Sequence, residues 1–193
     1  MKKFAVLAIA ALVSASAFAD DLGGAAINVN DTWYKANGWD SGFDFCTGGQ
    51  FGAESLGEIY SLTLGGQIQF WGSLTGDGIS GQLGYKFDSD ESSVNFLDLN
   101  WGWTDGGNGN QVWQTGGADF TGTSIDISGL SDGEHTLSVW FKGSNGSGDQ
   151  YDSNGNNNYV ATFTKATAVP EPATMSLLGL GALAMVIRRK LSK

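Results

Sequence analysis

Alternating apolar and polar residues recur in short runs through the middle of the chain, and glycine, asparagine, aspartate and serine separate the runs. A period of two is typical of β-strands that bury one face. The clearest run, residues 134–142, places His135, Leu137, Val139 and Phe141 on one face and Thr136, Ser138, Trp140 and Lys142 on the other. Residues 159–165 alternate in the same way, so the two runs predict a pair of strands.

Further strands are predicted at residues 25–29, 43–46, 58–64, 67–71, 82–87, 94–103, 112–114 and 124–127. Gly65 and Gly66 separate two of these runs by the length of a hairpin turn, which predicts a β-hairpin. The run at 94–103 has apolar residues on both faces and is expected in the middle of a sheet.

The body shows no sustained helical period, and the segments between its runs are too short for helices that join parallel strands. The pattern therefore predicts an all-β fold. We expect an antiparallel two-layer β-sandwich of roughly eight strands, of jelly-roll or immunoglobulin-like type.

The N-terminal end departs from this pattern. A basic start precedes an apolar run at residues 4–13, and Ala17 and Ala19 supply small residues at the spacing of a cleavage site. These features predict a signal peptide at residues 1–19. The exported body then covers residues 20–168, a length typical of one domain.

Residues 169–193 form a tail with three parts. Pro170-Glu171-Pro172 cannot join a helix or a central strand, because each proline fixes φ and lacks an N–H. Residues 173–187 carry no charge. As a helix they would cover roughly 22 Å of a ~30 Å hydrocarbon core, which predicts a short transmembrane helix. The basic residues Arg188, Arg189 and Lys190 follow, so the positive-inside rule places this end in the cytoplasm and the body outside.

This tail closely resembles the PEP-CTERM sorting signal of bacteria. The resemblance implies recognition by exosortase, a membrane transpeptidase-like enzyme, with Pro170, Glu171, Pro172, Arg188 and Arg189 as the sorting residues. It also implies processing near the Pro-Glu-Pro and delivery to the cell surface or the extracellular polysaccharide matrix. The alternative is an ordinary C-terminal anchor that follows a chance Pro-Glu-Pro linker.

The body is strongly acidic once the two ends are set aside. It holds nineteen of the twenty acidic residues and only four basic ones, so its net charge is −15. Such a surface repels nucleic acid and anionic lipid, and leaves cations or neutral ligands as partners. Cys46 is the one cysteine of the chain, so no internal disulfide is possible, and a buried, inert thiol is expected.

Residues suited to catalysis are scarce. The one histidine, His135, lies on the apolar face of its strand, where a hydrogen-bonded structural role is expected. The sequence contains no nucleophile triad, zinc pattern or phosphate loop. A carboxylate pair that acts on a glycosidic bond stays open, because nineteen acids could place two across a cleft. The favoured interpretation is a protein that is not an enzyme.

The polar loop at residues 143–158 is long for a hairpin connection, and such loops tend to be functional or disordered. Asp152, Asn154 and Asn156 alternate as oxygen donors around Gly155, as in the first half of a calcium loop. The acid at the twelfth position of an EF-hand is missing. The loop is therefore either a calcium site or solvated polar surface, and no other cofactor is expected.

Residues 137–159 also resemble the closing strands of starch-binding carbohydrate-binding modules of families 25 and 26. Those modules have an apolar strand, a Gly/Asn loop, Trp-Asp-Asn-Asn and a closing Asn-Tyr. Here Tyr151-Asp152-Ser153-Asn154 and Asn158-Tyr159 stand at these positions, with Tyr151 in place of tryptophan and Ser153 in place of asparagine. The resemblance implies sugar binding; the alternative is a ladder of asparagines that cap their own backbone.

A sugar-binding surface needs aromatic rings that point away from the core and lie beside amides and carboxylates. Trp140 meets the first condition, because the apolar residues of its strand point the other way. Tyr151, Asp152 and Asn154 follow in the adjoining loop and complete the predicted glycan site. The alternative is that Trp140 packs under residues 33–45.

The whole sequence predicts an exported PEP-CTERM surface or extracellular-matrix protein whose β-sandwich binds a polysaccharide without cleaving it. A structural or adhesive matrix protein without a small ligand is the first alternative, and a glycoside-active enzyme is the second. The expected partners are exosortase, the secretion machinery, extracellular polysaccharide, and the membrane through the C-terminal helix. Nucleic acid is not expected.

Overall fold

A computed structural model describes residues 22–36, 44–71, 79–104, 109–145 and 148–166. The predicted signal peptide, the sorting tail and the predicted transmembrane helix lie outside these residues. Within the described part of the chain, no helix is both long enough and apolar enough to cross a membrane.

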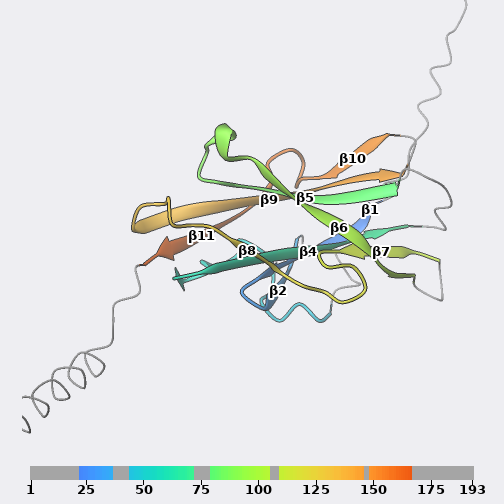
Figure 1. Cartoon of the computed structure of the whole chain (residues 1–193), viewed down its shortest axis with the longest axis horizontal. Helices are drawn as coiled ribbons and strands as arrows, with labels where there is room; N and C mark the ends of the chain where they lie inside the picture. Colours follow the sequence, from blue (N-terminus) through green and yellow to red (C-terminus); the bar gives the residue numbers. More distant parts are fainter. Residues whose placement is uncertain (1–21, 37–43, 72–78, 105–108, 146–147, 167–193) are drawn as a thin grey trace, which may run out of the picture.

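The described residues form eleven β-strands and one short 3-10 helix, and none of them is α-helical (Figure 1). The strands are β1 (Leu22–Val29), β2 (Thr32–Lys35), β3 (Glu58–Ile59), β4 (Leu62–Phe70), β5 (Ile79–Phe87), β6 (Asn95–Thr104), β7 (Gln111–Gln114), β8 (Thr123–Ile125), β9 (Gly133–Asn145), β10 (Asp149–Asp152) and β11 (Tyr159–Lys165). The helix η1 covers Glu91–Ser93. The predicted all-β class is confirmed.

The strands form one continuous, curled sheet. Its order is β2-β1-β4-β7-β6-β5-β9-β11-β3, with β10 added on β9 and β8 on β4. Strand β6 joins the two halves, because its first part pairs with β5 and its second part with β7. A bulge between Trp101 and Trp103 separates the two pairings. The prediction of purely antiparallel pairing is wrong at one edge, where β3 runs parallel to β11.

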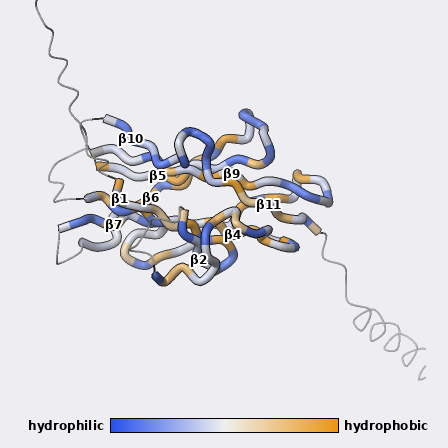
Figure 2. The backbone as a smooth tube through the Cα atoms, turned by 180° about the vertical axis from the view of Figure 1, so that it is seen from behind, coloured by the Kyte–Doolittle hydropathy of each residue, from blue (hydrophilic) through white to orange (hydrophobic). Residues whose placement is uncertain are grey.

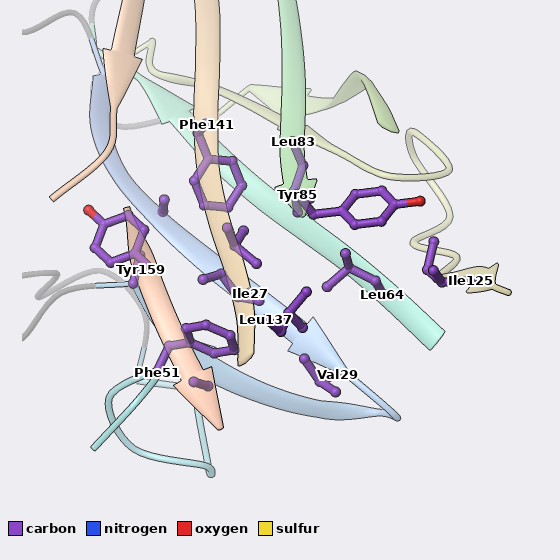
Figure 3. Close-up of a cluster of buried hydrophobic side chains, with 14 of the residues drawn as sticks. Ile27, Val29, Phe51, Leu64, Leu83, Tyr85, Ile125, Leu137, Phe141 and Tyr159 are labelled. Carbon is purple, nitrogen blue, oxygen red and sulfur yellow. The ribbon is translucent and has the colours of Figure 1, made fainter. Parts of the chain in front are cut away.

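The curl brings β1 and β4 opposite β5 and β9, and the core lies between them (Figures 1 and 3). Ile27 and Leu64 come from one half and Leu83, Leu137 and Phe141 from the other, and all are fully buried. The predicted division of residues 134–142 into two faces is confirmed by the buried face of β9. In Figure 2 the most hydrophilic stretches lie at the turns on the outside.

Gly65 and Gly66 do not form the predicted hairpin turn; they lie inside the single strand β4. A Cβ atom on Gly66 would stand 2.4 Å from Cδ1 of Leu83 and 2.9 Å from Cε1 of Phe141. A Cβ on Gly65 would stand 2.7 Å from Oγ1 of Thr115 on the opposite face. Glycine therefore serves close packing on both sides of the strand rather than a reversal of the chain.

Three other expectations need correction. Residues 44 and 45 of the predicted strand at 43–46 lie in a turn, residue 46 has no regular secondary structure, and residue 43 is outside the described part. The predicted loop at 143–158 contains strand β10, which pairs with the end of β9. Strand β6 does occupy the middle of the strand order, but most of its side chains are exposed.

Candidate functional site

Trp140 lies on the outer face of β9 and is half-buried, whereas Leu137, Val139 and Phe141 of the same strand are fully buried on the inner face. Its indole covers Gly84 of β5, its cross-strand partner. A Cβ atom on Gly84 would stand only 2.2 Å from Cε2 of Trp140. The missing side chain of the glycine thus creates the space in which the ring lies.

Phe96 of β6 meets the same ring from the other side. Gly84 pairs with Phe96 as well as with Trp140, so the glycine lies between two aromatic residues. The ring centroids of Phe96 and Trp140 are 5.9 Å apart at an interplanar angle of 87°, an edge-to-face arrangement that favours aromatic pairs. Phe96 remains 48% exposed, so this pair is accessible from solvent.

A polar row runs across the sheet beside the aromatic row. Strand register places Asp98, Gln82, Lys142 and Tyr151 side by side on β6, β5, β9 and β10. Nε2 of Gln82 donates a hydrogen bond of 3.0 Å to Oδ1 of Asp98. Tyr151 is 58% exposed. We call these four residues, together with Phe96, Gly84 and Trp140, the outer aromatic face.

Lys142 in the polar row is tied to β10. Its Nζ lies 2.9 Å from Oδ2 of Asp149, the residue at the start of that strand. The hydrogen bond and the charge of Asp149 raise the pKa of Lys142, so the ammonium group stays charged and oriented. The row thus offers an amide, a carboxylate and an ammonium group next to two aromatic rings.

The structure separates the four residues of the predicted glycan site. Tyr151 shares the outer face with Trp140, because it pairs with Lys142. Asp152 pairs with Phe141 and lies on the inner side, where its carboxylate accepts a hydrogen bond from the hydroxyl of Tyr159. Asn154 belongs to the β10–β11 turn. Sequence reasoning missed Phe96, Gln82 and Asp98, since only the pairing of β5 with β6 brings them to this face.

The described parts of the segment 33–45, residues 33–36 and 44–45, lie away from Trp140. Trp33 contacts Phe45 and Phe120 at centroid distances of 5.3 and 4.5 Å, on the outer side of β1, in the other half of the sheet. Cys46 is buried in that same small cluster, next to Ala26. The expected burial of this thiol is confirmed.

The asparagine-rich turn is closed by its own hydrogen bonds. Nδ2 of Asn154 donates to the carbonyl oxygen of Asn158, 3.2 Å away, and the Asn158 amide donates to the carbonyl oxygen of Ser153. Asn154, Asn156 and Asn158 all have positive φ, a conformation that asparagine tolerates better than most residues. These contacts match the backbone-capping alternative for this loop.

The same contacts bear on the predicted calcium ligands Asp152, Asn154 and Asn156. The Asp152 carboxylate is engaged by Tyr159. Among the residues that the structure describes, no group of three or more His, Cys, Asp or Glu side chains is arranged to hold a metal ion. Calcium binding by this turn stays a prediction.

His135 is held from two sides at the start of β9. Its Nδ1 lies 2.9 Å from Oδ2 of Asp88, and its Nε2 lies 2.9 Å from the carbonyl oxygen of Ser131. Both partners accept hydrogen bonds, so the imidazolium form, which donates from both nitrogens, fits best. The bond to Asp88, followed by that to Ser131, raises the pKa of His135. The predicted structural role agrees with these contacts.

Among known proteins and families, similarity to this chain is found at the tail. A search of curated proteins finds none with significant similarity to the chain. Residues 168–190 match the family model of the PEP-CTERM protein-sorting motif, which confirms the resemblance seen in the sequence. The match covers only this tail. The chain therefore carries the PEP-CTERM sorting motif that marks exported proteins as targets of exosortase.

Proposed function

We propose that the exported body binds a neutral polysaccharide on its outer aromatic face and does not cleave it. One observation carries the proposal: Trp140 and Phe96 form an accessible aromatic pair over Gly84, beside a row of hydrogen-bonding side chains. Sugar rings present patches of C–H groups that stack on aromatic rings, while amides and carboxylates take up the hydroxyl groups. Gln82 and Asp98 supply those polar contacts.

The charge of the body selects the kind of polysaccharide. A net charge of −15 over residues 20–168 repels polymers that carry carboxylate or sulfate groups. Neutral glycans escape this repulsion. The resemblance of residues 137–159 to starch-binding modules also supports a neutral glucan as the first ligand to test.

The sorting motif indicates where the protein acts. It implies export, processing by exosortase at the membrane and delivery to the surface. We propose that a short helix at residues 173–187 anchors the chain before processing, and that the mature body then lies in the extracellular matrix. We further propose that the curled sheet is a two-layer sandwich of jelly-roll or immunoglobulin-like type, and that its convex surface contacts the polysaccharide of the matrix.

A matrix protein that assembles by adding strands at its sheet edges is less well supported. The edge of β2 is covered by residues 48–51. The backbone N–H of Lys35 donates a hydrogen bond to the carbonyl oxygen of Gly49, and the backbone N–H of Phe51 donates to the carbonyl oxygen of Lys35. At the other edge, β3 has two residues only. Covered and very short edges discourage strand addition.

Retention in a native gel that contains a neutral polysaccharide tests the proposal. Soluble starch serves as the first probe, and a carboxylated polysaccharide serves as the anionic comparison. We expect wild-type protein to be retarded by starch only, and Trp140→Ala to migrate as if no starch were present. Val160→Ala removes an apolar side chain that is 43% exposed on the same face and should be retarded like wild type. Equal retardation of Trp140→Ala and Val160→Ala by starch would refute the assignment of the binding site to the outer aromatic face.

A further inference from the structure

A second aromatic surface lies on the other half of the curled sheet. Trp71, directly after β4, is 57% exposed, and Trp103 near the end of β6 is 44% exposed. Exposed apolar side chains that gather on one face mark candidate interaction sites. Trp101 is also exposed, but its register partner is Trp113, which places it on the opposite face of the sheet.

The strand register brings Trp71 and Trp103 to one face. Gln69, Val112 and Trp103 form a row across β4, β7 and β6. Trp71 follows Gln69 by two positions in the chain. Because side chains two positions apart in an extended chain point to the same face, Trp71 lies on the same side of the sheet as Gln69. Gln69 is partly exposed in this row, and Val112 beside it is buried. Trp71 therefore lies next to Gln69 along the chain, and Trp103 lies across the sheet on the far side of Val112.

The described strand segments of this surface carry no charged residue. None of the residues of β4, of β7 or of residues 99–104 in β6 is acidic or basic, although the body as a whole has a net charge of −15. An uncharged strip of indoles and amides on an acidic protein fits a neutral, hydroxyl-rich polymer. A basic or acidic partner would find no opposite charge on these strands.

The surface also lies far from the end of β11, the last described strand. The pairs Leu22–Phe70, Phe70–Gln111 and Thr104–Gln111 place it at the end of the sheet where β1 begins. Lys165 ends β11 at the opposite end (Figure 1). The motif at residues 168–190 starts three positions after that strand. The last described strand thus ends at the end of the sheet opposite the Trp71–Trp103 surface.

We propose that the Trp71–Trp103 surface is a second binding site for neutral polysaccharide, so that one body crosslinks two polymer strands. The inference rests on the proposed function of the outer aromatic face. That face belongs to β5, β6, β9 and β10, whereas the second site belongs to β4 and the far end of β6. Where both sites engage the same long polymer, the apparent affinity exceeds that of either site alone by roughly 10²–10⁴.

The test compares a long polymer with a short one on the full chain, kept in a detergent without a sugar headgroup. Soluble starch reports crosslinking by light scattering, and a short neutral maltooligosaccharide reports binding to single sites by calorimetry. We expect the double variant Trp71→Ala/Trp103→Ala to lose the scattering and to fall at least tenfold in apparent affinity for starch. It should still bind the oligosaccharide through the first site.

Two controls make the outcomes distinct. Tyr60→Ala removes an aromatic ring that is 55% exposed near the opposite end of the sheet and should scatter like wild type. Trp71→Phe/Trp103→Phe keeps rings in place and should retain most of the scattering. If the double alanine variant scatters like wild type, the second site is refuted while the first stands. If wild type binds neither probe, the proposed function itself fails.

Discussion

Trp140 lies across Gly84, its cross-strand partner, so closely that a Cβ atom on the glycine would stand 2.2 Å from the indole. A glycine in the interior of a strand normally weakens it, because it has no side chain to pack. An aromatic residue on the neighbouring strand can compensate by covering the gap. Here the compensation also fixes the orientation of a ring on the outside of the sheet, where it meets Phe96.

Gly84→Ala should displace this ring without removing it. The new methyl group would collide with the rigid indole, and overpacking of this kind costs about 1–3 kcal/mol of unfolding free energy. We expect a lower urea midpoint, altered tryptophan fluorescence and weaker starch retention. Gly129→Ala is the matched control, because a Cβ there has nothing within 4 Å. A Gly84→Ala variant that retains starch like wild type would show that the position of Trp140 does not matter.

The His135–Asp88 pair should make stability depend on pH. The pKa of His135 is raised above its ordinary 6.5 by the bond to Asp88, so the pair contributes fully below about pH 6.5. That contribution is lost as the pH rises through the pKa of the folded state. Lys165, which faces the ring, opposes this rise.

At low pH, the stability contributed by the pair is limited by protonation of Asp88. Partial burial opposes ionisation, but hydrogen bonds from Thr136 and His135 outweigh it and lower the pKa of Asp88 below its ordinary 3.8. Its contribution is therefore lost only as the pH falls through that lowered value. Urea midpoints measured from pH 5 to pH 9 should decline above pH 6.5 in wild type. The decline should be much smaller in His135→Phe; an identical decline in both would assign it to other groups.

Calcium binding by Asp152, Asn154 and Asn156 can be separated from general charge screening. Divalent ions should relieve the self-repulsion of an acidic body, so millimolar calcium should raise the melting temperature more than sodium of equal ionic strength. If the β10–β11 turn holds the ion, Asp152→Ala removes this difference. Tyr159→Phe is the control, because it deletes only the hydroxyl that donates to Asp152. An unchanged calcium effect in Asp152→Ala places the ion elsewhere.

The sorting motif predicts a defined processing defect. Replacement of Pro170, Glu171 and Pro172 by alanine should leave the chain uncleaved in the membrane fraction, because exosortase no longer recognises it. Mass spectrometry of the surface and membrane fractions measures this directly. Arrival of the variant at the surface with the normal mature mass would rule out exosortase processing at this motif.

Alternation in the sequence was sufficient to place Trp140. A strand exposes every second residue to the same face, so the buried Leu137, Val139 and Phe141 required the indole to point outward. The same rule shows why Asp152 was misplaced within the candidate site. The sequence predicts a loop at residues 143–158, but residues 149–152 form β10, in which Tyr151 and Asp152 must face opposite ways.

Two other features depend on contacts between distant segments. Gly65 and Gly66 have the spacing of a turn, and only the nearness of Leu83 and Phe141 reveals that they serve packing. Phe96 joins Trp140 because β5 pairs with β6 in one register among several that the alternation permits. Periodicity defines faces, but it does not define which strands are neighbours.

Calorimetric titration of a neutral maltooligosaccharide into wild type, Trp140→Ala, Trp140→Phe and Val160→Ala, with the urea midpoint of each, tests the central claim most directly. If the outer aromatic face binds sugar, Trp140→Ala weakens binding by about 1–2 kcal/mol, a factor of roughly 5–30, because the ring is a stacking surface. Its midpoint should stay near that of wild type, and Trp140→Phe and Val160→Ala should bind well. A Trp140→Ala variant with a lowered midpoint and unchanged affinity would contradict the account, since the ring would then be only a packing element of the sheet.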